Sequence, residues 1–346
     1  MFLSIIIPVY NGADTIGRCL DSIYKQGLSE SDFEVICVDD YSTEPSSVVA
    51  IEDYKYNDCI PHNLTLIYHK VNKRMGGARN TGVRLAKGEW IQFVDCDDYL
   101  LPNSLKQLQD IALSYPDLDL IHFCYLTGTE AQVLERSNEG RQASQIMTGS
   151  EYHIKLPGPS KATEALFRKS CFYTNNLWFE ENVRFEDVDF ATKFNILARK
   201  VIFVPIEAYY YIKHQGQTTD IKAEIDVIRE LFLLPNRMAH IAKEFMGTSD
   251  YYNNGSILMH HAALSCLLYT KRDLWKIGFK DRIAVLRETR LTFYTGYKSA
   301  DFIYHHPIIT SLLLIPMNQI LLNILIKGKK IKKHILNRQS TRCFCL

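Results

Sequence analysis

The sequence has 346 residues, a formal net charge of +1 and a hydrophobic fraction of 47%. This length suffices for one large catalytic domain with an appendage, and the hydrophobic fraction excludes a disordered or fibrous chain. Because nucleic-acid-binding domains usually carry a basic excess, the near-neutral charge argues against a nucleic-acid partner. The nine cysteines include no C-x-x-C pair, so we predict no zinc site.

Short apolar runs alternate with segments of helical periodicity over the first 125 residues. This alternation predicts an α/β fold, with a Rossmann-like, mostly parallel sheet flanked by helices. No G-x-G-x-x-G pattern follows the first strand, which argues against a dinucleotide-binding domain. The expected strands are 3–9, 33–38, 64–69, 90–94 and 118–125, and the expected helices are 14–26, 81–87 and 104–113.

Three of the expected strands end in polar clusters. The carboxyl ends of parallel strands meet at one edge of a sheet, where open α/β sheets bind their ligands. We therefore expect the three clusters to lie together. They are Tyr10 with Asn11, Asp39 with Asp40, and Asp95 with Asp97.

The segment after strand 90–94 carries three acids in four residues, namely Asp95, Asp97 and Asp98. Carboxylates at the end of a buried strand suit a hard cation, Mn²⁺ or Mg²⁺, that shares its ligands with substrate phosphates. The alternative is a solvated loop or a helix N-cap before Pro102.

A second cluster combines Arg74 and Arg79 with the glycines Gly76 and Gly77. Paired glycines allow a ligand to approach the backbone, and guanidinium groups suit phosphate. A helix that starts near Ala78 would add its N-terminal N–H groups. The cluster predicts a nucleoside diphosphate site, and the alternative is an ordinary surface turn.

Two adjacent acids, Glu186 and Asp187, stand between Phe185 and Phe190. A carboxylate that aromatic rings partly desolvate has a raised proton affinity and suits general-base catalysis. Acids are also common in the first turn of a helix because of the macrodipole, and the two interpretations are compatible.

His214 follows an aromatic run; it is a candidate contact for phosphate or metal, or else a polar surface residue.

The chain after residue 125 carries weaker signals. Residues 126–162 are polar and without a period, which predicts a mobile connection, and residues 221–300 predict a helical subdomain. The segment 301–346 is apolar and then basic, as in a peripheral membrane anchor; the alternative is a core helix with a solvated basic end.

The N-terminus lacks the pattern of a signal peptide, so we expect a cytoplasmic protein.

Five motifs give the chain a resemblance to a known family. It resembles family 2 glycosyltransferases of the GT-A fold, which are inverting nucleotide-sugar enzymes, over about residues 3–218. The resemblance implies a catalytic domain at 1–220, with a nucleotide-sugar half (1–125) and an acceptor half (126–220). The motifs are Ser4 to Asn11, Val38 to Ser42, Arg74 to Gly82, Asp95 to Asp98 and Arg184 to Asp187.

The resemblance also implies roles for individual residues. Nucleotide contacts would come from one group, a metal site from a second and acceptor activation from a third. The residues expected to contact the nucleotide are Pro8, Tyr10, Asn11, Asp39, Arg74, Arg79, Asp95 and His214. Asp95 and Asp97 would form the metal site, with Asp97 as the direct ligand. Asp187 would be the catalytic base, and Glu186 would orient the acceptor.

The expected reaction is a single inverting displacement. We expect one sugar to pass from a nucleoside-diphosphate sugar, UDP-linked in most of the family, to a saccharide or lipid-linked saccharide at the inner membrane face. The Gln-x-x-Arg-Trp motif of processive members is absent, which favours single addition over polymerisation. The alternatives are a metal-dependent nucleotidyltransferase and a catalytically dead nucleotide-sugar-binding scaffold.

Overall fold

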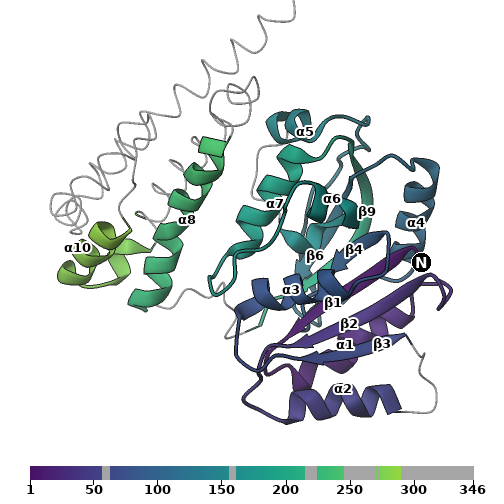
Figure 1. Ribbon diagram of the computed structural model, residues 1–346, viewed down its shortest axis with the longest axis horizontal. Coiled ribbons are helices and arrows are strands. Elements are labelled where there is room, and N and C mark those ends of the chain that lie inside the picture. Colours follow the sequence, from purple (N-terminus) through teal and green to yellow (C-terminus); the bar gives the residue numbers. More distant parts are fainter. Residues whose placement is uncertain (57–62, 156–160, 215–223, 245–269, 271–272, 290–346) are drawn as a thin grey trace, which may run out of the picture. The chain divides into compact units, whose positions relative to one another are not determined.

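A computed structural model describes residues 1–56, 63–155, 161–214, 224–244, 270 and 273–289 of the chain (Figure 1). The chain divides into two compact units, Met1–Gln217 and Thr218–Leu346. The finer predicted boundaries at 125, 220 and 300 stay predictions.

The first unit is built on one nine-stranded sheet. Its strands are β1 (Leu3–Val9), β2 (Phe33–Asp39), β3 (Leu64–Tyr68), β4 (Trp90–Phe93), β5 (Tyr99–Leu100), β6 (Leu120–Gly128), β7 (Val133–Arg136), β8 (Ala165–Arg168) and β9 (Val201–Ile212).

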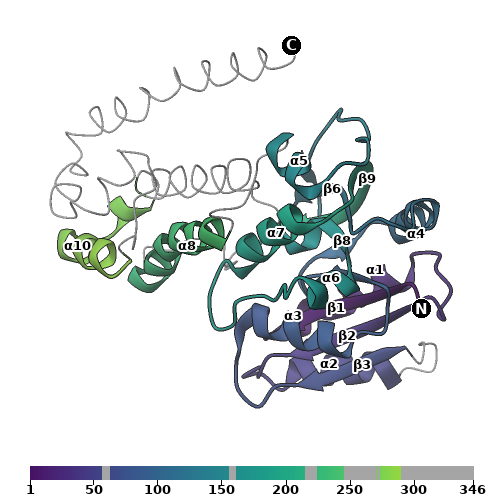
Figure 2. The ribbon, with the colours of Figure 1, turned by 45° about the horizontal axis from the view of Figure 1, so that its top comes forward.

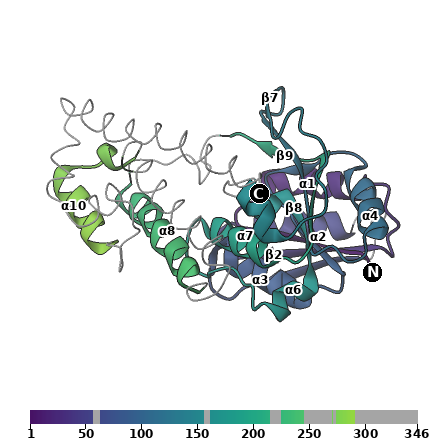
Figure 3. The same ribbon diagram turned by 90° about the horizontal axis from the view of Figure 1, so that it is seen from above.

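The strand order is β3-β2-β1-β4-β8-β6-β9-β5, with β7 beside β6. Strands β1, β2, β3, β4, β6 and β9 run in one direction, whereas β5, β7 and β8 run in the other. The sheet is thus mostly parallel, as predicted. Strand β7 extends from the sheet as part of a hairpin with β6 (Figure 3).

Helices cover both faces of this sheet (Figures 1 and 2). Residues of β1 alternate between two cores: Leu3, Ile5 and Ile7 face one, and Ile6 faces the other. Because both faces are covered, β1 is buried along its whole length. The first core contains α1 (Ala13–Tyr24), α2 (Ser46–Tyr56) and α4 (Ser104–Ser114), and the second contains α3 (Arg74–Leu85), α5 (Gly149–Lys155), α6 (Lys169–Thr174) and α7 (Glu186–Leu197).

Two expectations about local structure are wrong. Helix α3 begins at Arg74 rather than near Ala78, because its first two turns carry glycines and polar residues that give no amphipathic signal. The connection predicted at 126–162 holds β7 and α5. Strand β7 is exposed along its length, so it lacks the apolar alternation by which strands are recognised.

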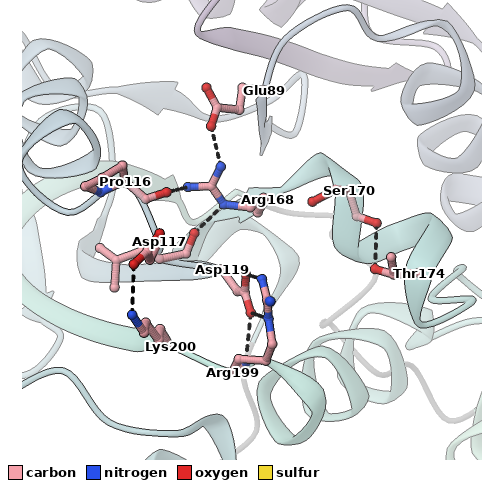
Figure 4. A network of polar contacts seen from close by, with 10 residues as sticks. Glu89, Pro116, Asp117, Asp119, Arg168, Ser170, Thr174, Arg199 and Lys200 are labelled. Carbon is pink, nitrogen blue, oxygen red and sulfur yellow. Dashed lines mark hydrogen bonds and ion pairs between the residues drawn. The ribbon is translucent and has the colours of Figure 1, made fainter.

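A polar network closes the amino ends of β4, β6 and β9 (Figure 4). Arg168 contacts Glu89 and the carbonyl oxygen of Leu118, donates to the carbonyl of Pro116 at 2.6 Å, and lies over the Trp90 ring. It therefore ties the loop before β6 to β4 and β8.

The same network contains a fork-shaped ion pair. Asp119 is buried and accepts three hydrogen bonds from Arg199, two from the guanidinium at 3.0 Å and one from the backbone at 2.8 Å. Asp117 accepts a bond from Lys200 at 3.0 Å on the surface. Burial alone would raise the pKa of Asp119, but the bonds from Arg199 outweigh it and hold that pKa below its usual range.

The described part of the second unit is helical. It contains α8 (Ile225–Glu244), a 3-10 turn (Leu274–Lys276) and α10 (Phe279–Glu288). Arg229 of α8 contacts Asp226 and Glu288, and the Asn236 amide donates to the carbonyl of Thr289 at 2.7 Å. The predicted membrane tail, 301–346, lies outside the described residues. Within those residues, no helix has both the length and the apolar character needed to cross a membrane.

Candidate active site

The ends of β1 and β2 are joined through Asn11. Its side-chain oxygen accepts a bond from the Thr43 N–H at 3.0 Å, its amide donates to the Thr43 hydroxyl at 3.0 Å, and its N–H donates to Ser42 at 3.0 Å. Asn11 has a positive φ of 51°, which asparagine tolerates better than most residues. These contacts of Asn11 are within the protein, and they fix two loops at the sheet edge.

Next to this junction lies the corner formed by Pro8, Tyr10 and Asp39. Pro8 lies in β1 opposite Val38, and the Tyr10 side chain is exposed. Asp39 is buried, and one of its oxygens accepts a bond from the Ser42 N–H at 3.2 Å. The other oxygen has no hydrogen-bond partner among the described residues. A buried acceptor left unpaired is costly, so an N–H or O–H of a ligand would satisfy it.

A buried network that sequence reasoning missed fixes the loop before α3. Asp40 contacts the His69 ring at 2.7 Å and accepts a bond from the Lys73 N–H at 2.8 Å. The other ring nitrogen of His69 lies 2.9 Å from the Thr81 hydroxyl. No local pattern links residues 40, 69 and 81, so only the folded chain reveals the network.

The glycine pair lies inside α3 rather than in a ligand-binding loop. A Cβ added at Gly76 would lie 2.3 Å from the carbonyl oxygen of Glu180 and 3.1 Å from the Glu186 side chain. Glycine therefore lets α3 approach the segment before α7. Arg74 starts the helix with a positive φ of 59°.

Arg79 joins the two halves of the candidate site. Its guanidinium is buried and donates to Asp95 at 2.8 Å and to Glu186 at 2.6 Å. Burial alone would lower the pKa of Arg79, but the neighbouring carboxylates raise it, so the group stays charged. These ion pairs connect the predicted metal-binding segment to the predicted catalytic helix.

Asp97 and His214 are in contact with each other. The His214 ring lies 2.9 Å from an Asp97 carboxylate oxygen, and the Asp97 side chain keeps 34% of its surface exposed. Arg18 of α1 donates to the Asp97 carbonyl at 2.8 Å and contacts Glu130 in the β6–β7 hairpin. His214, which is predicted to contact phosphate or metal, thus lies beside the Asp-x-Asp segment.

Asp98 anchors this segment to strand β9. It is buried, and it accepts bonds from the Tyr209 hydroxyl at 2.6 Å and from the Ile212 N–H at 2.8 Å. The same hydroxyl accepts a bond from the Asp95 N–H at 3.1 Å. Tyr209 therefore sets the path of the chain that carries Asp95 and Asp97, a role that no sequence motif indicated.

Glu186 and Asp187 occupy the first turn of α7. Glu186 is buried against Arg79, and its pKa is raised by burial, with Arg79 opposing the rise. Asp187 is only partly buried. Its charge raises the pKa of Asp95 and of Glu164, although burial is the larger cause at both residues, so the three carboxyl groups lie near one another.

Backbone strain marks the rim of the site. Eight non-glycine residues in the described part have positive φ, and five of them are asparagine. The other three are Tyr41, Arg74 and Phe185, for which this conformation is unusual. They follow Asp40, begin α3 and precede Glu186, respectively. Such strain concentrates at functional sites.

A divalent metal fits the donor set at Asp97. No three His, Cys, Asp or Glu side chains within the described ranges converge as a self-contained metal site. Asp97 and His214 offer a carboxylate oxygen and an imidazole nitrogen, and Asp95 lies in the same loop. Such a set suits a metal, Mn²⁺ or Mg²⁺, that completes its shell with phosphate oxygens and water.

Known proteins are similar to this chain in sequence and in fold. Residues 4–169 match the sequence model described as Glycosyl transferase family 2. The chain is 33% identical to an uncharacterized glycosyltransferase of Haemophilus influenzae, over 67% of this chain and 77% of that protein. It is 32% identical to the poly(ribitol-phosphate) beta-glucosyltransferase of Bacillus spizizenii over 63% of this chain, and it spans about a third of that longer protein, 33%.

A solved structure has a similar fold. Residues 1–349 of TarS from S. aureus, solved in complex with UDP-GlcNAc, superpose with a TM-score of 0.64. The match covers 90% of this chain and 91% of that one, at 20% sequence identity. At this identity the likeness concerns the fold, and it agrees with the predicted GT-A class.

Proposed function

Because the chain belongs to glycosyltransferase family 2 and is thus a glycosyltransferase, we propose that it moves one sugar from a UDP-sugar to an acceptor hydroxyl with inversion. One observation carries the proposal. Arg79 brings the Asp-x-Asp segment after β4 and the Glu186–Asp187 pair of α7 to one place through two bonds under 3 Å. Carboxylates for a metal and a partly exposed carboxylate for proton transfer thus share one site.

The nucleotide would occupy the edge formed by β1, β2 and α3. The unpaired oxygen of Asp39 is an acceptor for the ring N–H of a uracil, and the exposed Tyr10 ring offers a face for stacking. Asn11 fixes the loops around this corner, and Pro8 lies beside it in β1. Arg79 donates to the carboxylates of Asp95 and Glu186, so we assign it to positioning these two residues. We assign Arg74 to contact with the phosphates of the nucleotide.

A metal, Mn²⁺ or Mg²⁺, would be held by Asp97, with Asp95 and His214 beside it. Bound there, it would neutralise the charge that builds on the departing diphosphate. The chain's own part is to fix the ligands: Arg18 holds the Asp97 carbonyl, and Tyr209 holds the Asp95 N–H.

Asp187 is the proposed general base. Removing the acceptor proton as the oxygen attacks the anomeric carbon makes that oxygen a stronger nucleophile. Attack from the face opposite the diphosphate converts an α-linked donor into a β-linked product. Glu186 is held by Arg79 and supports Asp187 from the preceding position.

The acceptor and the location belong to the same proposal. The similarity to a poly(ribitol-phosphate) glucosyltransferase supports an acceptor in surface polysaccharide assembly, polymeric or lipid-linked. An acceptor of that kind would place the enzyme at the cytoplasmic face of the membrane, with the basic tail 301–346 as its contact.

The test is a product assay on a panel of nucleotide sugars with Mn²⁺, with Mg²⁺ and with chelator. We expect metal-dependent release of a nucleoside diphosphate from one donor, with water or an added saccharide as acceptor. Release of pyrophosphate instead would indicate a nucleotidyltransferase. Nucleotide binding without any release, even with membrane lipid extracts as acceptor, would contradict the proposed reaction.

A further inference from the structure

Four side chains form a polar and aromatic group, here named the Lys161 cluster: Tyr125, Lys161, Glu164 and Tyr211. The charge of Asp187 acts on two of them, Lys161 and Glu164. The Lys161 ammonium lies 3.5 Å from a Glu164 oxygen. It also lies 4.6 Å from the centre of the Tyr125 ring and 4.9 Å from that of Tyr211. One cation thus faces two aromatic rings and one carboxylate.

The cluster stands on the framework of the catalytic site. Tyr125 of β6 is paired with Tyr209 of β9, and Tyr211 follows two residues later on the same strand. Side chains two apart on a strand share a face, so both cluster tyrosines lie on the face from which Tyr209 holds the Asp-x-Asp segment.

Glu164 is held firmly by its backbone. It ends a 3-10 turn, Ala162–Glu164, and His122 of β6 hydrogen-bonds to its backbone. The Gln92 amide of β4 donates to the neighbouring Thr163 carbonyl at 3.3 Å. The turn is therefore fixed against the strand that leads to Asp95.

The charge of Asp187, the proposed base, contributes to the pKa shifts of Glu164 and Lys161. Burial raises the pKa of Glu164 to about 7 against the opposing effect of Lys161, and Asp187 adds to the rise. Burial alone would lower the pKa of Lys161, but Glu164, the two tyrosines and Asp187 together raise it. The Lys161 side chain keeps 40% of its surface exposed and Glu164 keeps 17%, so a ligand can reach both.

The ion pair between Lys161 and Glu164 adds little to stability. Lys161 and Glu164 are three residues apart in one turn, so their ion pair joins no two elements of the fold. Pairs of this kind contribute little free energy, whereas shielding a carboxylate from water beside another carboxylate is unfavourable. Charged groups held in this way next to a site are typical of ligand recognition.

We propose that the Lys161 cluster is the acceptor subsite and that it recognises a neutral polyhydroxyl group, a sugar ring or a polyol. Glu164 accepts a hydrogen bond from a hydroxyl next to the reacting one, Lys161 donates to another, and the rings of Tyr125 and Tyr211 pack on the C–H face. The carboxylates of Glu164 and Asp187 oppose the single ammonium, which disfavours a phosphate at this point. The inference rests on the proposed role of Asp187.

The test uses the full chain, the donor found active in the panel, and four acceptor probes. Three probes are neutral (glycerol, ribitol and methyl β-D-glucopyranoside), and the fourth is ribitol 5-phosphate. Glycoside formed and free sugar released are measured separately for wild type, Glu164→Gln and Lys161→Met. Lys106→Met is the matched control, because Lys106 forms a similar near-neighbour pair with Asp110 on the surface of α4.

We expect wild type to glycosylate at least one neutral probe. Glu164→Gln and Lys161→Met should each raise the KM for that probe about tenfold or more, as expected for a lost charge-assisted hydrogen bond. The KM for the donor should change far less, and Lys106→Met should behave as wild type.

Four results would overturn the inference. In the variants they are an unchanged acceptor KM in both, or an equal rise in the donor KM. In wild type they are transfer to ribitol 5-phosphate alone, or transfer to none of the probes. Failure of the proposed function has a different signature. Wild type would then release no diphosphate from any donor, with water, saccharides or membrane lipid extracts as acceptor, and the premise of the inference would be removed as well.

Discussion

At the residue scale, Arg79 links the two acidic segments of the candidate site. It is buried, and it donates to two carboxylates from distant parts of the chain, those of Asp95 and Glu186. The motif around it could be recognised in the sequence, where it suggested a phosphate contact. Its partner Glu186 is 107 positions away, so no local pattern could indicate that the guanidinium acts within the protein.

Replacing Arg79 should therefore cost stability. Arg79→Gln leaves Asp95 and Glu186 without their cation, and breaking a buried ion pair by removing one partner destabilises by about 3–5 kcal/mol. Arg84→Gln on the same helix is the control, since Arg84 is half exposed and pairs only loosely with Glu181. Denaturant unfolding measures both, and equal midpoints for the two variants would contradict the assigned role.

At the scale of elements, the packing of α3 against the segment before α7 depends on glycine. Long buried strands such as β1 and β2 could be predicted because both of their faces are apolar. The start of α3 could not, because Gly76 and Gly77 are poor helix formers, and the close approach that requires glycine at position 76 involves the distant residue Glu180. The supporting roles of Tyr209 and His69 were missed for the same reason: their partners are distant in sequence.

Two glycine-to-alanine changes test this packing. Gly17 lies in α1 with nothing within 4 Å of an added Cβ, so Gly17→Ala should stabilise the protein by about 0.5–1 kcal/mol through helix propensity. Gly76→Ala has the same propensity gain, but its Cβ would lie 2.3 Å from a backbone oxygen. We expect it to destabilise the fold and to reduce turnover. A thermal midpoint for Gly76→Ala at or above that of Gly17→Ala would contradict the packing.

At the scale of the whole molecule, the sheet separates two ends with different tasks. The carboxyl ends of β1, β2 and β4 carry the candidate site, and the amino ends of β4, β6 and β9 carry the network around Arg168 and Asp119 (Figure 4). This second end serves stability, so changes there should alter unfolding and leave the chemistry alone.

The pH dependence of stability tests that division. The pKa of Asp119 is lowered in the folded protein, so its contribution is present above the unfolded pKa of about 4 and is lost as the pH falls through the folded value. Asp119→Asn should lower the free energy of unfolding at neutral pH by about 1–3 kcal/mol, and its difference from wild type should shrink in acid. Asp117→Asn, at an exposed pair, is the control. A difference that persists at low pH would contradict the assignment.

The most direct test of the account is the turnover of Asp187→Asn. Removal of a general base lowers kcat by about 10²–10⁴-fold, so we predict a loss of that size in diphosphate release, with the Kd for UDP unchanged. Asp110→Asn, at an exposed carboxylate on α4, should turn over as wild type does. Turnover by Asp187→Asn at the wild-type rate would contradict the claim that the first turn of α7 supplies the base.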